Sequence, residues 1–103
     1  MLTHIIMWTF KDEYDGGTKA ENVLKAKGLL EQCVGLVPGQ GRFEARIGAM
    51  PGCTADLMLY SEFSDEAALK AYQTHPTHVA LAPFLKAAVS GRMCMDYVDE
   101  TDV

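Results

Sequence analysis

Four side chains in the sequence could carry acid–base chemistry: His4, Tyr72, His75 and His78. Tyr72, His75 and His78 follow one another at intervals of three residues, so a helix end and a turn could direct them into one cavity. An imidazole with an ordinary pKa of about 6.5 can remove an acidic proton at neutral pH. A phenol in a dry pocket can then donate a hydrogen bond to the resulting anion. The pattern is therefore compatible with proton transfer on a small molecule.

Each of these residues also has a purely structural interpretation. His75 precedes a proline where a helix is expected to end, and its ring could donate a hydrogen bond to the free carbonyls there. His78 could make a structural hydrogen bond in the first turn of the next helix. Tyr72 could be a core aromatic with a satisfied hydroxyl, and His4 a satisfied core histidine on a buried strand. The residues alone leave catalysis and structure both open.

A metal site is a third interpretation of the same histidines. His75 and His78 are three residues apart, and Asp96 or Glu62 could add a carboxylate. However, Pro76 interrupts the helical register that would align the two rings, and no third ligand stands out. Glycine-rich phosphate loops and the G-x-S-x-G nucleophile pattern are also missing from the sequence. We therefore expect no metal and no cofactor.

The net charge and the cysteines of the chain limit the binding partners and the cellular compartment that we expect. The 103-residue chain has a formal charge of −5 and nine scattered Lys and Arg residues. Nucleic-acid binders usually carry a dense basic patch, so we expect no nucleic-acid partner and no membrane partner. The apolar run 2–10 is too short to span a bilayer. Three cysteines without a C-x-x-C pair fit a reducing compartment, so we expect a cytoplasmic protein.

Two residues near the C-terminus are expected to be inert. Cys94 falls on a predicted strand and is interpreted as a buried, unreactive thiol. Asp96 belongs to an acidic group, with Asp99, Glu100 and Asp102, that we expect to be solvated. Neither residue is therefore assigned to the site.

Hydrophobic periodicity predicts the order strand, helix, strand, strand, helix pair, strand. The predicted strands are 2–11, 42–49, 55–63 and 92–98, and the predicted helices are 18–37, 64–75 and 77–86, with Thr18, Ser64 and Thr77 as N-caps. Pro83 is expected to start, kink or split the third helix. This order is the split βαβ, or ferredoxin-like, arrangement, an α+β fold whose four-stranded antiparallel sheet carries its helices on one face. Residues 1–103 are expected to form a single domain.

Both faces of this sheet are predicted to be apolar. Strand alternation places Ile5, Met7, Met58 and Tyr60 on one face and Ile6, Trp8, Leu57 and Leu59 on the other. The helices can cover only one face, and burying one such side chain contributes about 1.5–3 kcal/mol. A second copy of the same sheet is the simplest cover, since two-fold homodimers are the commonest oligomers. The sequence therefore predicts a homodimeric α/β barrel, the alternative being a face that stays partly solvated.

Several segments of the chain resemble the stress-responsive α/β-barrel (Dabb) family. They are HIIMWTFK at the start, LVPG at the end of the first predicted helix, YSEFSDEAALKAYQTHPTHV, and RMCMDY near the end. The resemblance runs from Met1 to about Val98 and implies a ferredoxin-like protomer in a dimeric α/β barrel. It also implies a link to stress response. A plant member is a polyketide cyclase whose catalytic pair is the Tyr and the last His of a Y-x-x-H-P-x-H pattern, which here are Tyr72 and His78.

The resemblance and the residues together give an expected site. His78 would act as the base and Tyr72 as the hydrogen-bond donor. The ligand would be held by His4, Ile6, Trp8, Leu57, Leu59, His75 and Phe84. We expect a homodimer that binds a small apolar or aromatic-like ligand, with cyclase, lyase or isomerase activity if it is an enzyme. The alternatives are a non-catalytic, stress-associated binding protein, and a cofactor-independent monooxygenase or haem-related member of the wider superfamily.

Overall fold

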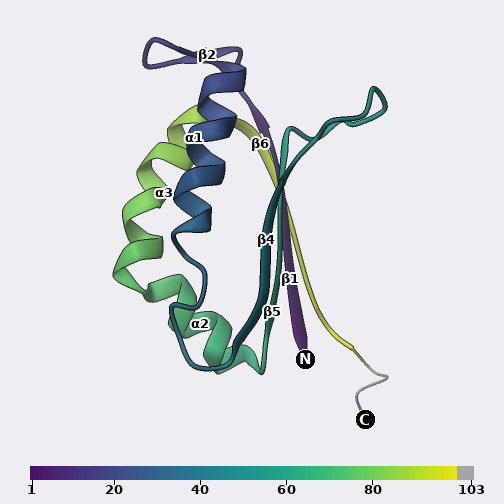
Figure 1. Ribbon diagram of the computed structural model, residues 1–103, viewed down its shortest axis with the longest axis vertical. Helices are drawn as coiled ribbons and strands as arrows, with labels where there is room; N and C mark the ends of the chain where they lie inside the picture. The colour runs from purple at the N-terminus through teal and green to yellow at the C-terminus, as the bar shows by residue number, and fades with distance from the viewer. Residues whose placement is uncertain (100–103) are drawn as a thin grey trace.

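The computed structural model describes residues 1–99, in which helices pack on one face of an antiparallel sheet (Figure 1). The strands are β1 (Leu2–Phe10), β2 (Glu13–Tyr14), β3 (Gly17–Thr18), β4 (Gln40–Ile47), β5 (Leu57–Phe63) and β6 (Val89–Val98). The helices are α1 (Lys19–Glu31), α2 (Glu66–Thr74) and α3 (Pro76–Ala88). Of the predicted acidic end, Glu100 and Asp102 lie outside the described residues. No helix in this part of the chain is long and apolar enough to cross a membrane.

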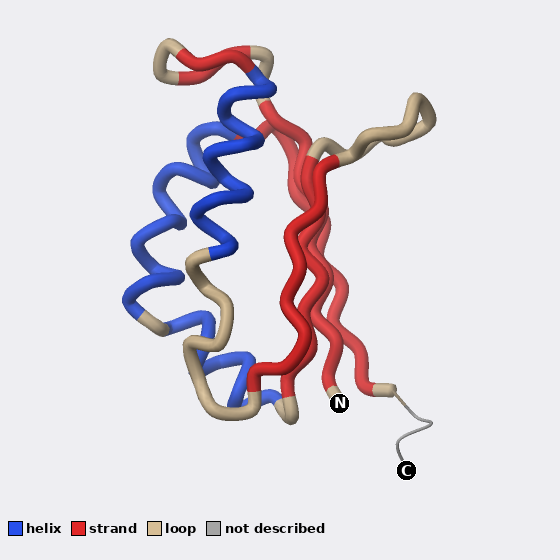
Figure 2. The backbone as a smooth tube through the Cα atoms, in the orientation of Figure 1, coloured by secondary structure: helices blue, strands red, loops and turns tan. Residues whose placement is uncertain are grey.

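The main sheet has the strand order β4-β5-β1-β6, with antiparallel pairing throughout. All three helices lie on the same side of it (Figure 2). This confirms the predicted α+β fold with helices on one face. The predicted turn at 12–17 also contains a small hairpin, β2–β3, whose turn residues Asp15 and Gly16 both have positive φ values (52° and 80°). Such values are those of a two-residue hairpin turn.

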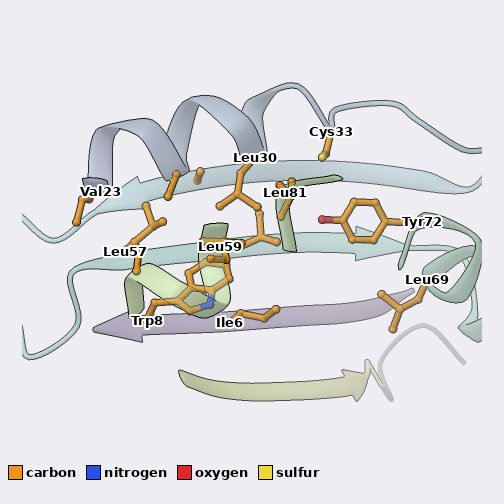
Figure 3. Packing of buried hydrophobic residues seen from close by; sticks show 14 of the residues in the cluster. Ile6, Trp8, Val23, Leu30, Cys33, Leu57, Leu59, Leu69, Tyr72 and Leu81 are labelled. Carbon is orange, nitrogen blue, oxygen red and sulfur yellow. The ribbon is translucent and has the colours of Figure 1, made fainter. Parts of the chain in front are cut away.

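The inner face of the sheet supplies most of the core. Successive side chains of β1 alternate, so that Ile6 and Trp8 are buried beneath the helices while Met7 between them is exposed. Leu57 and Leu59 of β5 lie beside them, each 1% exposed. Figure 3 shows these four side chains packed with residues of α1, α2 and α3.

Helix α1 begins as predicted and ends earlier than predicted. The capping box is present, with the Thr18 hydroxyl accepting from the Glu21 N–H and the Glu21 carboxylate accepting from the Thr18 N–H. The helix ends at Glu31, however, and not at Pro38-Gly39. The Gln40 side chain accepts from the backbone N–H groups of Leu36 and Val37 and donates to the Cys33 carbonyl. These hydrogen bonds satisfy backbone groups of a non-helical connection, which the apolar periodicity of the sequence did not predict.

The predicted caps of α2 and α3 are each displaced by a residue or two. Asp65 rather than Ser64 caps α2, and its carboxylate accepts from the Ala68 N–H. His75 rather than Thr77 caps α3, and its Nδ1 accepts from the Thr77 N–H at 3.1 Å. With His75 as the cap, Pro76 occupies the first turn, where its missing N–H costs nothing. Pro83 is exposed and does not split the helix.

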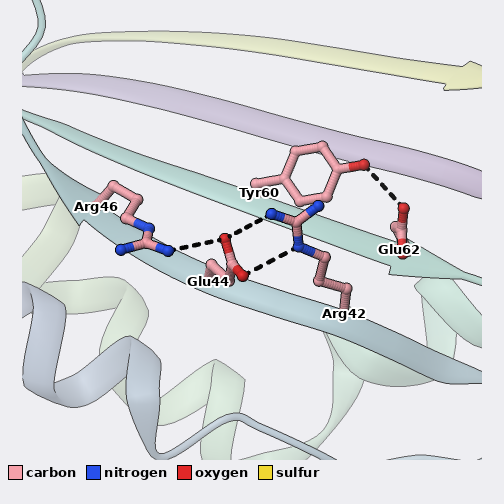
Figure 4. A network of polar contacts seen from close by, with 5 residues as sticks. All are labelled: Arg42, Glu44, Arg46, Tyr60 and Glu62. Carbon is pink, nitrogen blue, oxygen red and sulfur yellow. Dashed lines mark hydrogen bonds and ion pairs between the residues drawn. The ribbon is translucent and has the colours of Figure 1, made fainter.

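The outer face of the sheet is apolar on three strands and charged on the fourth. Its most exposed large apolar residues are Met93 (77%), Met95 (65%), Met7 (43%) and Tyr97 (43%). They lie on the neighbouring strands β1 and β6, and Met7 is paired directly with Met93. On the neighbouring edge, Glu44 of β4 accepts two hydrogen bonds from Arg42 and one from Arg46, and the Tyr60 hydroxyl donates to Glu62 (Figure 4). The structure thus confirms that both faces of the sheet carry large apolar side chains.

Replacing His75 by Ala is expected to lower the free energy of unfolding by about 0.5–2 kcal/mol, the usual cost of losing an N-cap. His75→Asn keeps a side-chain acceptor and is expected to restore most of the loss. Urea unfolding of the three proteins measures the difference. Equal stability of the Ala variant and the wild type would contradict the capping role.

Candidate functional site

A cavity of about 300 Å³ lies between α3 and the inner face of β1 and β6. It is lined by Ile6, Trp8, His78, Leu81, Ala82, Leu85, Lys86, Val89 and Arg92. Its volume is at the lower end of the range of about 300–1,000 Å³ that is usual for ligand sites. The lining is mostly apolar, with one imidazole and two cations as its strongly polar groups.

Five of the lining residues belong to α3. Leu81 and Ala82 follow His78 by three and four residues, and Leu85 and Lys86 follow it by seven and eight. These intervals place all five side chains on one face of the helix. The same spacing was readable in the sequence and could have added these residues to the predicted site.

His78 is oriented by the end of α2. Its Nδ1 lies 2.9 Å from the Gln73 carbonyl oxygen, which can only accept, so Nδ1 carries the proton. Nε2 is then left with its lone pair. Burial lowers the pKa of His78, the hydrogen bond to Gln73 opposes this, and the nearby charge of His4 lowers the pKa further. The ring is therefore neutral at pH 7 and able to accept a proton at Nε2.

Tyr72 lies behind His78 and is not part of the cavity lining. Its side chain is fully buried, and its ring centroid is 4.6 Å from that of His78 and 5.2 Å from that of Phe63. Burial strongly raises the pKa of its hydroxyl. Among the buried side chains of residues 1–99, this hydroxyl is the one polar group without a hydrogen-bond partner. Figure 3 shows it pointing toward Leu81, which lines the cavity.

The other predicted site residues lie elsewhere. Leu57 and Leu59 are core residues beneath the helices, and His75 is the cap between α2 and α3. Phe84 is half-buried, with its ring centroid 6.1 Å from that of Tyr14 and the Lys25 ammonium 4.4 Å away. His4 is buried on β1, and its Nδ1 contacts an Asp96 carboxylate oxygen. Of the predicted residues, the cavity therefore gathers only Ile6, Trp8 and His78.

Two cations that the sequence interpretation missed border the cavity. Lys86 extends from α3 and Arg92 from β6, and both are exposed. Within residues 1–99 neither takes part in an ion pair, and no carboxylate is among the lining residues. An apolar cavity with two cations suits an amphipathic ligand with an anionic group. Arg92 comes from a strand whose pairing with β1 only the folded chain shows.

The metal ligands that the sequence offered are not brought together. The Nδ1 atoms of His75 and His78 are both engaged with backbone groups, and Glu62 bonds Tyr60 on the outer face. A different set, His4, Cys94 and Asp96, places one donor atom each within 4.8 Å of the others. Cys94 is exposed rather than buried, which corrects the expectation of a core thiol.

The sheet order and the helices on one face define a ferredoxin-like α+β protein. The chain belongs to the Dabb family, the stress responsive A/B barrel domain, whose family model matches residues 2–99. This confirms the resemblance seen in the sequence. No curated protein matches the chain.

Solved structures share the fold over almost the whole chain. A dimeric protein of unknown function with a ferredoxin-like fold from Bacteroides fragilis is 27% identical, with 95% of each chain covered and a TM-score of 0.74. A Dabb family protein from Mesorhizobium loti is 25% identical, with the same coverage and a TM-score of 0.68. An antibiotic biosynthesis monooxygenase is 16% identical, with 96% of this chain and 98% of its own covered and a TM-score of 0.71. At that identity the last likeness shows the fold alone.

The lowered pKa of His78 predicts how stability depends on pH. The unfolded chain takes up a proton on this ring as the pH falls below about 6.5, whereas the native state resists protonation to a lower pH. The stability of the wild type should therefore decline between pH 6.5 and the native pKa, and His78→Gln should lose less over the same window. An NMR titration of the His78 ring gives the native pKa directly. A midpoint at or above 6.5 would contradict the geometry.

The unpartnered hydroxyl of Tyr72 predicts an unusual response to its removal. A buried polar group without a partner costs about 1–3 kcal/mol, so Tyr72→Phe is expected to leave the free energy of unfolding unchanged or to raise it by up to that amount. Thermal and urea unfolding measure the change. A clear loss of stability would show that the hydroxyl has a structural partner.

Proposed function

We propose that the protein binds a small apolar or aromatic carbonyl compound with an anionic group and catalyses proton-transfer chemistry of the cyclase, lyase or isomerase type. The observation that carries the proposal is His78. Its ring lines a mostly apolar cavity, while the bond from Nδ1 to Gln73 keeps Nε2 unprotonated. A neutral imidazole in such a cavity is suited to act as a general base at physiological pH.

The proposed reaction begins with removal of a proton from a carbon between two carbonyl groups. Nε2 of His78 takes the proton, and the C–H electron pair becomes an enolate. In a cyclase, the enolate carbon attacks a second carbonyl of the same molecule and forms a C–C bond, leaving an alkoxide. His78, now an imidazolium, returns the proton to that oxygen, so the base is regenerated and no redox partner is needed.

The residues that line the cavity supply the interactions that would bind the ligand. Trp8, Ile6 and Leu85 exclude water from the apolar part of the ligand. Lys86 and Arg92 are placed to hold a carboxylate at the rim, and they favour the negative charge that develops on the enolate. We assign the oxyanion hydrogen bond to Tyr72, because its hydroxyl has no partner among residues 1–99 and points toward Leu81.

A binding protein without turnover is the second candidate. It is supported by the position of Tyr72, which stacks behind His78 instead of lining the cavity, and by the capping role of His75. In that case the cavity would still select an apolar anion, and His78 would contribute only a hydrogen bond. The two candidates make different predictions for turnover and agree on binding.

We also propose that the working form is a homodimer joined through the outer face of the sheet. The exposed residues Met7, Met93, Met95 and Tyr97 form an apolar surface that a second copy of the sheet would cover. Related structures with this fold, from Bacteroides fragilis and Thermobifida fusca, are dimeric. The cavity lies on the opposite face, so dimerisation leaves its helical wall in place.

The catalytic proposal is tested with a short aryl diketo acid as the probe, followed by chromatography of the cyclised product. His78→Gln is expected to lower the turnover rate at least about 100-fold, the usual contribution of a general base. Tyr72→Phe should lower turnover while keeping the fold. Lys27→Met, on α1 and away from the cavity, serves as the matched control for Lys86→Met, which should weaken probe binding.

Two outcomes would contradict catalysis. Full turnover in the His78→Gln variant would remove the base from the mechanism. Binding of the probe by the wild type without any product would favour the binding protein instead. Circular dichroism of each variant separates loss of function from loss of fold.

A further inference from the structure

A second group of polar side chains lies on the inner face of the sheet and is not among the residues that line the His78 cavity. His4 of β1 is paired in register with Asp96 of β6, and Ile6, two residues further along β1, is paired with Cys94. Residues two apart on a strand share a face, so Cys94 and Asp96 both stand beside His4. The three residues come from the two ends of the chain, and only the β1–β6 pairing brings them together.

We propose that His4, Cys94 and Asp96 form a binding site for a divalent transition-metal ion of the zinc class. Cys94 Sγ lies 3.9 Å from His4 Nδ1 and 3.8 Å from Asp96 Oδ1, and Nδ1 and Oδ1 are in hydrogen-bond contact. In a tetrahedral zinc site, bond lengths of about 2.0–2.3 Å place such donor atoms about 3.3–3.6 Å apart. The sulfur already stands at nearly that separation, so only the Nδ1–Oδ1 contact has to open to admit the ion.

The donor chemistry favours zinc over harder ions. One imidazole nitrogen, one thiolate sulfur and one carboxylate oxygen form a mixed set typical of zinc, whereas magnesium and calcium prefer oxygen ligands alone. A thiolate and a carboxylate together balance the charge of a divalent ion. Three protein ligands leave a fourth position for water or another small ligand, as in open zinc sites.

The local structure holds His4 in place and leaves Cys94 and Asp96 open to solvent. The His4 side chain is 2% exposed, and the carbonyl of the same residue accepts a hydrogen bond from buried Ser61, so β1 holds it rigidly. Cys94 is exposed, and the Asp96 side chain is 42% exposed. An ion can therefore enter from the β6 side of the sheet without rearrangement of the core.

The same three residues do not fit a Cys-His-Asp nucleophilic triad. In such a triad the acid and the nucleophile bond different ring nitrogens of the histidine. Here both Asp96 and Cys94 approach the same atom, Nδ1 of His4, which cannot serve both at once. A bound metal ion removes this competition for Nδ1, because it takes the place of the protons between the three donor atoms.

The test is titration of the metal-free full chain with Co²⁺, followed by competition with Zn²⁺. The wild type is expected to bind one ion per chain and to show a thiolate-to-cobalt charge-transfer band that Zn²⁺ abolishes. Cys94→Ser should remove the band. It should also weaken binding by at least about 10-fold, because even second-shell partners of a metal contribute that much. Asp96→Asn should weaken binding while the band remains.

Cys53→Ser is the matched control, since Cys53 is also an exposed cysteine but lies outside the cluster. It should bind Co²⁺ like the wild type. Absence of the charge-transfer band in the wild type would overturn the proposal, as would its persistence in Cys94→Ser or its loss in Cys53→Ser. Because the readout is metal binding alone, the result does not depend on whether His78 is catalytic.

Discussion

The alternation of side chains along β1 determines which groups face the helices and which face outward. This strand lies between β5 and β6, and it carries large apolar groups toward both of its faces. The helices cover one face, where Ile6 and Trp8 are buried, and leave Met7 exposed on the other. A one-residue shift in register would exchange the two sets, so the position of every functional group follows from this pairing.

The inner face divides into a filled half and an open half. Beneath α1 and α2 the core is closed, and Tyr72 and Phe63 are wholly buried there. Beneath α3, near the β6 edge, the packing leaves the cavity that His78 borders. The Tyr72 hydroxyl has no hydrogen-bond partner among residues 1–99, and such a buried polar group costs stability.

The sequence predicted what depends on local pattern. The order of elements, the two apolar faces, the Thr18 capping box and the placement of Trp8 beside a cavity all follow from periodicity and short-range chemistry. The predicted end of α1 was wrong, because the Gln40 side chain of β4 forms hydrogen bonds with backbone groups of the segment after the helix and holds it in a non-helical form. Local pattern could not tell that His75 caps a helix while His78, three residues later, reaches the cavity.

Other parts of the site depend on long-range pairing. Arg92 reaches the cavity, and Cys94 and Asp96 reach His4, only because β6 pairs with β1 in one register. In the sequence these residues are separated from their partners by almost the full length of the chain, and no spacing rule connects them. The sequence predicted Tyr72 as a hydrogen-bond donor of the site, but its depth behind His78 is a product of packing between α2 and α3.

We propose that a second copy of the chain covers the outer face of the sheet, and the mass of the protein in solution tests this proposal. Multi-angle light scattering at micromolar concentration should give twice the 11.3 kDa of one chain for the wild type and for Val79→Glu, which alters an exposed apolar residue on the helical side. Met95→Glu, which places a charge in the apolar surface, should give the mass of a single chain. A wild-type particle of 11.3 kDa would show that the outer face is not covered by a second chain.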